Sequence, residues 1–250
     1  MVLLVYSDYS GRVRQTGFEI IHGAITRADV EEKQLAFVFT GDEHADGAEK
    51  IISALNLHSI KASFFFTGRF YRNAAFKANI RKLVRDGHYL GAHSDKHLLY
   101  CDWNLRDSLL VTKQVFIKDL ENNYHEMRHF GIKKTDARYF LPPYEWYNDS
   151  ISVWTAELGL QLINHTHGTL SHADYTVPKM INYRGSKEIF DSILSYESSH
   201  ENGLNGFILL VHIGTAPERT DKFYEYLESL ILELKSRGYT FKRVNELLDQ

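Results

Sequence analysis

The segment LAFVFT at residues 35–40 is a continuous run of apolar and β-branched side chains. A strand that is buried on both faces has this pattern, because helices cover both sides of a parallel sheet. Further runs of this kind follow at residues 62–67 (ASFFFT) and 88–93 (HYLGAH). The segments between them, at 47–57 and 74–85, carry apolar residues at helical spacing. We therefore predict strands joined by helical crossovers, which is the order of an α/β fold.

The same alternation continues to the end of the chain. We predict further strands at 137–141, 160–164, 207–212 and 239–243, and helices at about 104–129, 149–158, 186–196 and 221–237, before a short closing helix. This order predicts a distorted (β/α) barrel of about seven or eight parallel strands, with an open doubly wound sheet as the alternative. Neither a GxGxxG nor a GxxxxGK[ST] motif follows the first strand, so nucleotide binding has little support.

The first part of the chain differs from the rest. Residues 1–34 are polar, show no clear period and carry Gly11, Gly17 and Gly23. We interpret them as an irregular N-terminal extension packed on a barrel domain of residues 35–250. A chain of 250 residues fits one large domain of this class.

Composition narrows the function classes. Hydrophobic residues make up 44% of the chain and charged residues 24%, and the net charge is -3. This balance does not suggest a nucleic-acid binder and suits a neutral or weakly charged substrate. Cys101 is the single cysteine, so no intrachain disulfide can form. We expect no membrane span, and residues 1–8 lack the basic start and the apolar length of a signal peptide.

Polar side chains gather where the predicted strands end. Asp42 and Glu43 follow the first strand, His93 and His97 follow the third, and His212 closes the run 207–212. In α/β barrels the carboxyl ends of the strands meet on one face, which holds the active site. Two imidazoles four residues apart can converge on a zinc-like metal, and adjacent acids are costly to bury without a cation. The sequence therefore predicts a metal site formed by His93, His97 and one acid of the Asp42-Glu43 pair.

Each of these features also has an ordinary structural explanation. The chain has thirteen histidines, so one H-x-x-x-H spacing can arise by chance. Asp42 and Glu43 could be solvated acids of an exposed turn. His212 is either a satisfied group at the edge of the core or a proton donor, and Asp174 either orients it or forms an Asx turn.

The remaining polar and aromatic residues near these motifs are less specific. A loop carries His165, His167 and His172, which form a polar rim more simply than a second metal site. Tyr144 and Trp146 follow the strand predicted at 137–141, and aromatic faces at a cleft suit the apolar faces of sugar rings. Core packing explains such residues equally well.

Together these segments resemble the polysaccharide deacetylase family, carbohydrate esterase family four, from about residue 35 to residue 248. The family motif T-F-D-D-G corresponds to TGDEH at 40–44, and H-[ST]-x-x-H is matched fully by HSDKH at 93–97. The motif R-x-P-Y is matched in part by LPPY at 141–144. Asp174-Tyr175 and LVH at 210–212 correspond to the two weaker motifs that follow.

The resemblance implies removal of N- or O-acetyl groups from an acetylated poly- or oligosaccharide, by a protein outside the cytoplasm (periplasmic or secreted). It implies a divalent metal, zinc first, with cobalt or nickel as alternatives. Its site residues carry over as the base Asp42, the metal ligands Glu43, His93 and His97, the acid His212, and Asp174 that orients this acid. We expect the substrate to contact Tyr144, Trp146 and Pro143.

Three departures from the family pattern bear on activity. Glu43 stands where the family has the metal-binding Asp and is one methylene longer. Gly41 and His44 replace Phe and Gly. Leu141 replaces the Arg that pairs with the base, so we expect Asp42 to be protonated more easily. Two other functions therefore stay open: a C–N hydrolase acting on a non-sugar amide, and a non-catalytic glycan-binding relative.

Overall fold

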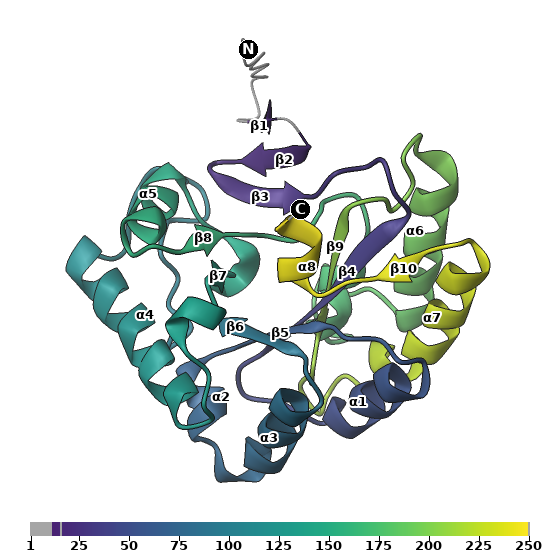
Figure 1. Cartoon of the computed structure of the whole chain (residues 1–250), viewed down its shortest axis with the longest axis horizontal. Helices are drawn as coiled ribbons and strands as arrows, with labels where there is room; N and C mark the ends of the chain where they lie inside the picture. Colours follow the sequence, from purple (N-terminus) through teal and green to yellow (C-terminus); the bar gives the residue numbers. More distant parts are fainter. Residues whose placement is uncertain (1–11, 16, 250) are drawn as a thin grey trace.

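A curved sheet runs through the centre of the molecule, and helices line its outer side (Figure 1). The computed structural model describes residues 12–15 and 17–249. The strands lie in the order β1-β2-β3-β9-β4-β5-β6-β7-β8, and β10 pairs with β4. Their bounds are β1 (Arg12–Gln15), β2 (Phe18–Ile21), β3 (Ala24–Arg27), β4 (Gln34–Gly41), β5 (Ser63–Phe66), β6 (Tyr89–Ala92), β7 (Tyr139–Phe140), β8 (Gln161–Leu162), β9 (Phe207–His212) and β10 (Thr240–Phe241).

Parallel pairing dominates this sheet. Neighbouring strands from β9 through β4, β5, β6 and β7 to β8 are all parallel. β3 joins β9 at Arg27 and Phe207, and on its other side Ile25 bridges Ile163. The Asn164 N–H also donates to the Ile25 carbonyl at 3.0 Å, so β3 lies between the two ends of the parallel sheet. The predicted α/β fold, a distorted barrel of mostly parallel strands, is confirmed.

The expectation of an irregular start is wrong for residues 12–27. β1, β2 and β3 pair antiparallel, and their two turns contain Gly17 (φ 90°) and Gly23 (φ 79°). Each strand has only four residues, so its alternation was too short to reveal a period. Residues 1–8, for which we expect no signal peptide, lie outside the described residues. The division into an extension (1–34) and a barrel domain (35–250) stays a prediction.

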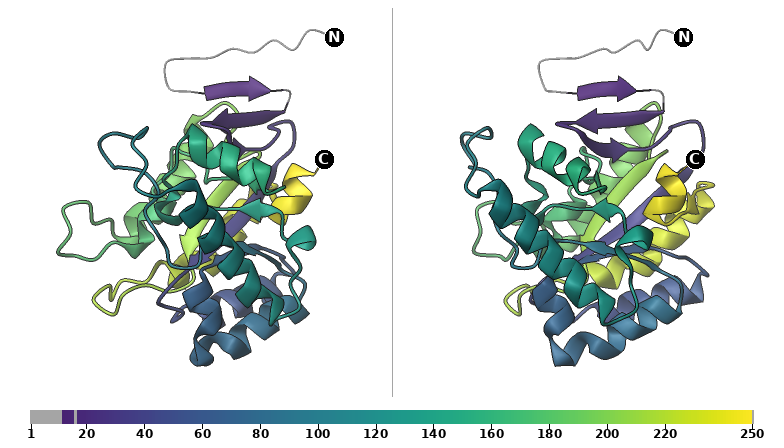
Figure 2. Two further views of the ribbon diagram at one scale, coloured as in Figure 1. Left: turned by 90° about the vertical axis from the view of Figure 1, so that its left-hand side faces the viewer. Right: turned by 60° about the vertical axis from the view of Figure 1, so that its left-hand side comes forward.

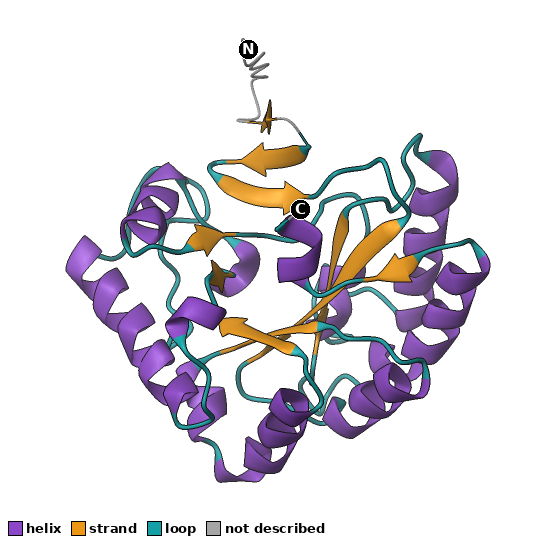
Figure 3. Ribbon diagram, in the orientation of Figure 1, coloured by secondary structure: helices purple, strands orange, loops and turns teal. Residues whose placement is uncertain are grey.

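Most helices pack against the outer side of the sheet, whereas α8 (Val244–Leu248) packs on the inner apolar cluster (Figure 3). The helices are α1 (Ala48–Leu57), α2 (Gly68–Arg72), α3 (Lys77–Arg85), α4 (Lys113–Arg128), α5 (Asp149–Glu157), α6 (Ser186–Ser199), α7 (Leu227–Ser236) and α8 (Val244–Leu248). Within the described part of the chain, no helix has the length and apolar character needed to cross a membrane.

The helix expected at 104–129 begins later, at Lys113. Thr112 caps it, since its hydroxyl accepts a hydrogen bond from the Val115 N–H at 3.3 Å. Before this cap, the Asp102 carboxylate accepts from the N–H groups of Asn104 and Leu105 and holds the chain in a turn. The segment from residue 103 to residue 111 is therefore a loop, and its helical spacing was misleading.

Alternating side chains of the strands build two apolar layers. In β4, Phe37 and Phe39 pack with the helices, whereas Val38 lies in the inner cluster of the barrel. Phe39 stacks on Phe64 of β5 with ring centroids 5.0 Å apart. This packing on both faces explains why β4 is a continuous apolar run in the sequence.

We expect Phe64→Ala to lower the free energy of unfolding by about 3–5 kcal/mol, because it leaves a cavity in the outer layer. Urea denaturation followed by circular dichroism measures this loss. Leu232→Ala, at a side chain that is 52% exposed on α7, is the control and should change stability by less than about 0.5 kcal/mol. Similar losses for both variants would contradict the assignment of Phe64 to the core.

Candidate active site

A cavity of about 610 Å³ opens at the carboxyl ends of the parallel strands. Its wall brings together the site residues Asp42, Glu43, His93, His97 and His212. Loops that follow the strands project on this side of the molecule (Figure 2). The expected gathering of strand-end residues on one face therefore occurs.

His93 and His97 lie side by side in this wall. Their ring centroids are 5.1 Å apart. His93 Nδ1 lies 2.8 Å from the Leu141 carbonyl oxygen, so this nitrogen donates and Nε2 is left with a lone pair. Burial lowers the pKa of His93 well below its usual value and that of His97 to about 4. Both imidazoles are therefore neutral at neutral pH, which is the form that binds a metal.

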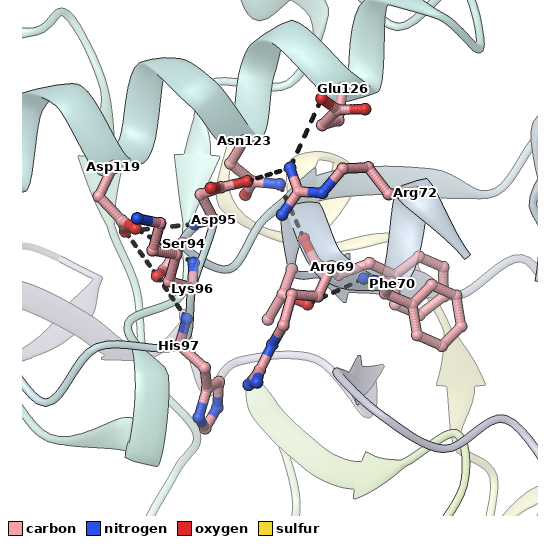
Figure 4. A network of polar contacts seen from close by, with 12 residues as sticks. Arg69, Phe70, Arg72, Ser94, Asp95, Lys96, His97, Asp119, Asn123 and Glu126 are labelled. Atoms are coloured by element: carbon pink, nitrogen blue, oxygen red, sulfur yellow. Dashed lines mark hydrogen bonds and ion pairs between the residues drawn. The ribbon is translucent and has the colours of Figure 1, made fainter.

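Asp119 of α4 holds the loop that carries these histidines (Figure 4). Its carboxylate accepts from the Ser94 hydroxyl at 2.6 Å and from the N–H groups of Asp95 and Lys96 at 3.2 and 3.1 Å. Ser94 (φ 73°) and His97 (φ 55°) both have left-handed backbones, which cost energy outside glycine. These bonds compensate for that strain. No sequence pattern singles out Asp119, because an acid within a helix looks like an ordinary solvated residue.

Arg69 of α2 pairs with both acids. Its Nε donates to Asp42 Oδ1 at 3.0 Å, its Nη2 also contacts Asp42, and its Nη1 donates to Glu43 Oε1 at 3.1 Å. The Thr67 hydroxyl donates to Asp42 Oδ1 at 2.7 Å. The expectation that Asp42 lacks a cation is therefore wrong, since an arginine from another element supplies the charge.

Two further observations explain why Arg69, and not an arginine at position 141 or Arg138, pairs with Asp42. Leu141, at the family's arginine position, is buried in the inner apolar cluster, where a guanidinium would lose its hydration. Arg138 pairs instead with Asp249, away from the cavity. Sequence reasoning missed Arg69 because the short helix α2 was not predicted.

The side chains of this wall are of the types that bind a divalent metal, but the two acids, Asp42 and Glu43, pair with Arg69. Neutral imidazoles and carboxylates on one wall are the usual ligands of zinc. Among the described residues, however, a group of at least three such residues whose ligand atoms all lie within 4.8 Å of one another occurs only at His125, Glu126 and His129, at the end of α4. His93 and His97 therefore form the prepared half of the site, and the Asp42-Glu43 pair is held by the arginine.

Asp174 and His212 form a dyad on the opposite side of the cavity. Asp174 lies in the 3₁₀ helix η4 (Ser171–Tyr175) and is buried. Its carboxylate lies 2.6 Å from His212 Nδ1 and accepts from the His212 N–H at 2.9 Å. Burial alone would lower the pKa of His212, but Asp174 outweighs this effect and leaves the pKa raised. His212 is thus suited to donate a proton.

Aromatic side chains border the cavity mouth. Tyr144 packs against the His97 ring with centroids 4.4 Å apart, and Trp103 lies 5.7 Å from Tyr144. Tyr144 and Trp103 are exposed and belong to the cavity wall. As the structure describes it, that wall does not include Trp146 or Pro143. Pro143 is buried, and Trp146 packs against Trp103, so both support the wall from behind.

The loop histidines are not a polar rim as a group. His165 is buried, and its ring lies 4.8 Å from that of His172 and 4.7 Å from that of His167. Burial, with the neighbouring His172, lowers the pKa of His165 well below its usual value. His172 is half-buried, and of the three only His167 is exposed.

A comparison with family models gives a match to the polysaccharide deacetylase model over residues 27–163, more than half of the chain. The chain belongs to the polysaccharide deacetylase family. The matched segment contains the acids, the histidine pair and the Tyr144 loop. It ends before Asp174 and His212, whose pairing is seen in the structure itself.

Relatives of known sequence are distant but cover most of the chain. The protein YlxY of Bacillus subtilis (strain 168) is 25% identical over 248 residues, which are 99% of this chain and 66% of that protein. The peptidoglycan-N-acetylmuramic acid deacetylase PdaA of Bacillus subtilis (strain 168) is 24% identical over 227 residues, 91% of this chain and 76% of that protein.

Solved structures share the fold of this polysaccharide deacetylase domain. PdaA of Bacillus subtilis superposes with a TM-score of 0.69 at 21% identity, over 92% of this chain and 91% of that one. A pseudoenzyme of carbohydrate esterase family 4 from Bacillus anthracis superposes with a TM-score of 0.71 at 18% identity, over 92% of this chain and 70% of that one.

We expect Arg69→Gln to tighten zinc binding by about tenfold, because it removes a cation that holds the acids away from the histidines. Isothermal titration calorimetry with zinc chloride measures this change. The control is Arg81→Gln, at an exposed arginine of α3, which should leave the affinity unchanged. Unchanged or weaker zinc binding by Arg69→Gln would show that Arg69 does not compete with the metal.

Proposed function

We propose that this chain is a hydrolase that removes acetyl groups from an N- or O-acetylated poly- or oligosaccharide. The observation that carries the proposal is one cavity whose wall holds both a carboxylate, Asp42, that Arg69 and Thr67 fix in place, and an imidazole, His212, whose pKa is raised by Asp174. Relatives named as peptidoglycan deacetylases support it and make N-acetylated sugars of peptidoglycan the first substrates to test.

Asp42 is the general base in this proposal. Arg69 and Thr67 hold its carboxylate at the cavity wall, so its orientation is set before the substrate arrives. It accepts a proton from the water that attacks the acetyl carbonyl. Both partners donate hydrogen bonds to the carboxylate and leave its direction fixed.

His212 is the general acid. Asp174 fixes its orientation through Nδ1, which leaves Nε2 to give a proton to the departing amine or alkoxide. The backbone N–H of Tyr144 is the donor that we assign to the oxyanion of the tetrahedral intermediate. The exposed rings of Trp103 and Tyr144 offer apolar faces to the sugar.

His93, His97 and a carboxylate of the Asp42-Glu43 pair, with Glu43 assigned first, would hold the metal. A bound zinc ion, or cobalt or nickel in its place, would polarise the acetyl carbonyl and bring the pKa of water toward neutrality. His93 is prepared for this role because its Nδ1 already donates to Leu141.

A non-catalytic glycan-binding protein is the second candidate. It is favoured by the ion pairs of Arg69 with Asp42 and Glu43, which occupy the acids without a metal. A structural relative is itself described as a pseudoenzyme. Glycan binding without acetate release would support this candidate over the hydrolase. An enzyme acting on a non-sugar amide would instead hydrolyse cyclic amides or imides and leave glycans unchanged.

We expect the zinc-loaded protein to release acetate from N-acetylglucosamine oligomers, peptidoglycan fragments or acetylated xylan. Asp42→Asn should lose activity by at least about 100-fold, because a positioned base contributes about 10²–10⁴ to the rate. Acetate release, measured by a coupled assay, gives the rate, and calorimetry confirms that zinc still binds. Asp191→Asn, at an exposed acid on α6, is the control. Full turnover by Asp42→Asn with metal bound would show that Asp42 is not the base.

The activity should also fall as the pH rises through the raised pKa of His212, because only protonated His212 can donate. Asp174→Asn removes the carboxylate that raises this pKa. We therefore expect the alkaline limb of the kcat profile to move to lower pH in this variant. A limb that stays in place would mean that another group donates the proton.

A further inference from the structure

Glu145 has an unusual backbone at the edge of the cavity. It and Tyr144 lie in the 3₁₀ helix η3 (Pro143–Glu145), with φ values of 54° and 60°. Two successive non-glycine residues in the left-handed region carry strain that the surroundings must hold. Here the Glu145 N–H donates to the Pro142 carbonyl at 3.1 Å, and the Glu145 carbonyl accepts from Asn164 Nδ2 at 2.8 Å.

Most of the strained backbone positions lie at this cavity. Among the described residues, six non-glycine residues have positive φ, and Ser94, His97, Tyr144 and Glu145 surround this cavity or hold its histidine loop. Strained backbone clusters where a side chain must be presented in one direction. Glycine would take the backbone conformation of Glu145 at lower cost. We therefore infer that the glutamate side chain has a role that compensates for this cost.

Glu145 shares the cavity wall with His212 of the dyad. It lines the cavity and interacts electrostatically with His212 and Asp174. Residues 12–15 and 17–249 offer its oxygens no hydrogen-bond donor within bonding distance. Burial, reinforced by Asp174, raises the pKa of Glu145 to about 7, although His212 opposes the shift. Glu145 is half-buried, and its carboxyl group, in the wall of the cavity and with no donor from these residues, can accept a hydrogen bond from a bound ligand.

The position of Glu145 indicates where that donor lies. His212 is the group that we assign to the leaving atom of the substrate, and Glu145 is close enough to His212 to raise its pKa. A donor that reaches the Glu145 carboxylate is therefore on the leaving-group side of the scissile bond. In an acetamide this side carries an N–H, whereas an acetate ester has no hydrogen there.

We propose that Glu145 is the specificity residue for amide substrates, binding the acetamide N–H and afterwards the amine product through its carboxylate. This inference rests on the proposed deacetylase function and names its substrate class. Water adds to the carbonyl carbon and loses a proton to Asp42. The C–N bond then breaks as His212 protonates the nitrogen, giving acetic acid and a free amine, and the acid returns a proton to His212 and leaves as acetate. The amine takes up the proton held by Asp42 and leaves as an ammonium ion.

Glu145 favours the amide over the ester for an electrostatic reason. An ammonium product gains from a neighbouring carboxylate in a desolvated cavity, whereas a hydroxyl product carries no charge. A site that hydrogen-bonds a substrate N–H also discriminates against the analogue that lacks it.

The test compares kcat/KM for an N-acetylglucosamine tetramer with that for an O-acetylated xylo-oligomer. We expect Glu145→Gln to lower the amide value about 10- to 100-fold, as for loss of a hydrogen bond to a charged group, and the ester value less than about threefold. Glu218→Gln, at an exposed glutamate of the same cavity, should leave the ratio unchanged. Equal losses on both substrates, or no loss on the amide, would overturn the inference.

A binding measurement separates this inference from the proposed function. If the wild-type protein hydrolyses neither substrate, the proposed function fails, and calorimetry with a glucosamine tetramer decides the role of Glu145. We expect Glu145→Gln to weaken binding of this amine about tenfold and to leave binding of the N-acetylated tetramer unchanged. Equal changes for both tetramers, or no binding of the amine by the wild-type protein, would overturn the inference.

The variant Glu145→Gly tests whether the effect of Glu145→Gln comes from a loss of stability. It relieves the left-handed strain, so we expect its melting temperature to equal or exceed that of the wild-type protein. It should nevertheless lose the discrimination between amide and ester, or between amine and N-acetylated tetramer, as Glu145→Gln does. Retention of the full discrimination by the glycine variant would overturn the inference.

Discussion

Every residue assigned to the site depends on the parallel pairing of β9, β4, β5, β6 and β7. Parallel strands must end on the same face of the sheet, and residues that follow β4, β6, β7 and β9 line the cavity. Asp42 and His212 are far apart in sequence, yet β4 and β9 are direct neighbours with Thr40 opposite His212. The proposed base and the proposed acid therefore lie in one cavity wall because of the register of two strands.

Charge is distributed across this space in an ordered way. Arg69 balances two acids on one side, and His212 lies between two acids on the other. The neutral rings of His93 and His97 lie in the same cavity wall as Asp42, Glu43 and His212. In the proposed mechanism, one group of this wall accepts a proton and another donates one.

Arg69 has a double effect on this arrangement. It supplies the cation that the buried Leu141 cannot, and it draws Glu43 away from the histidines. The same contact thus supports the proposed base and opposes the proposed metal site. Fold similarity extends both to PdaA and to a pseudoenzyme, so likeness of fold does not decide between turnover and binding. The balance between Arg69 and a metal ion is the physical quantity on which that choice depends.

The sequence by itself determined the α/β order of strands and helices and the polar residues that follow the strands. Apolar runs such as 35–40 between helical segments indicate strands buried on both sides, and the carboxyl ends of parallel strands lie on one face. The short strands β1 to β3 were missed because four residues are too few to show a period. The loop at 103–111 was predicted as part of a helix because its apolar residues have helical spacing. Only the tertiary structure decided the partners: Arg69 beside Asp42, Asp119 under the histidine loop, and Glu145 in one cavity wall with His212. These contacts join residues more than twenty positions apart, and side-chain direction across such distances depends on packing, which no local pattern encodes.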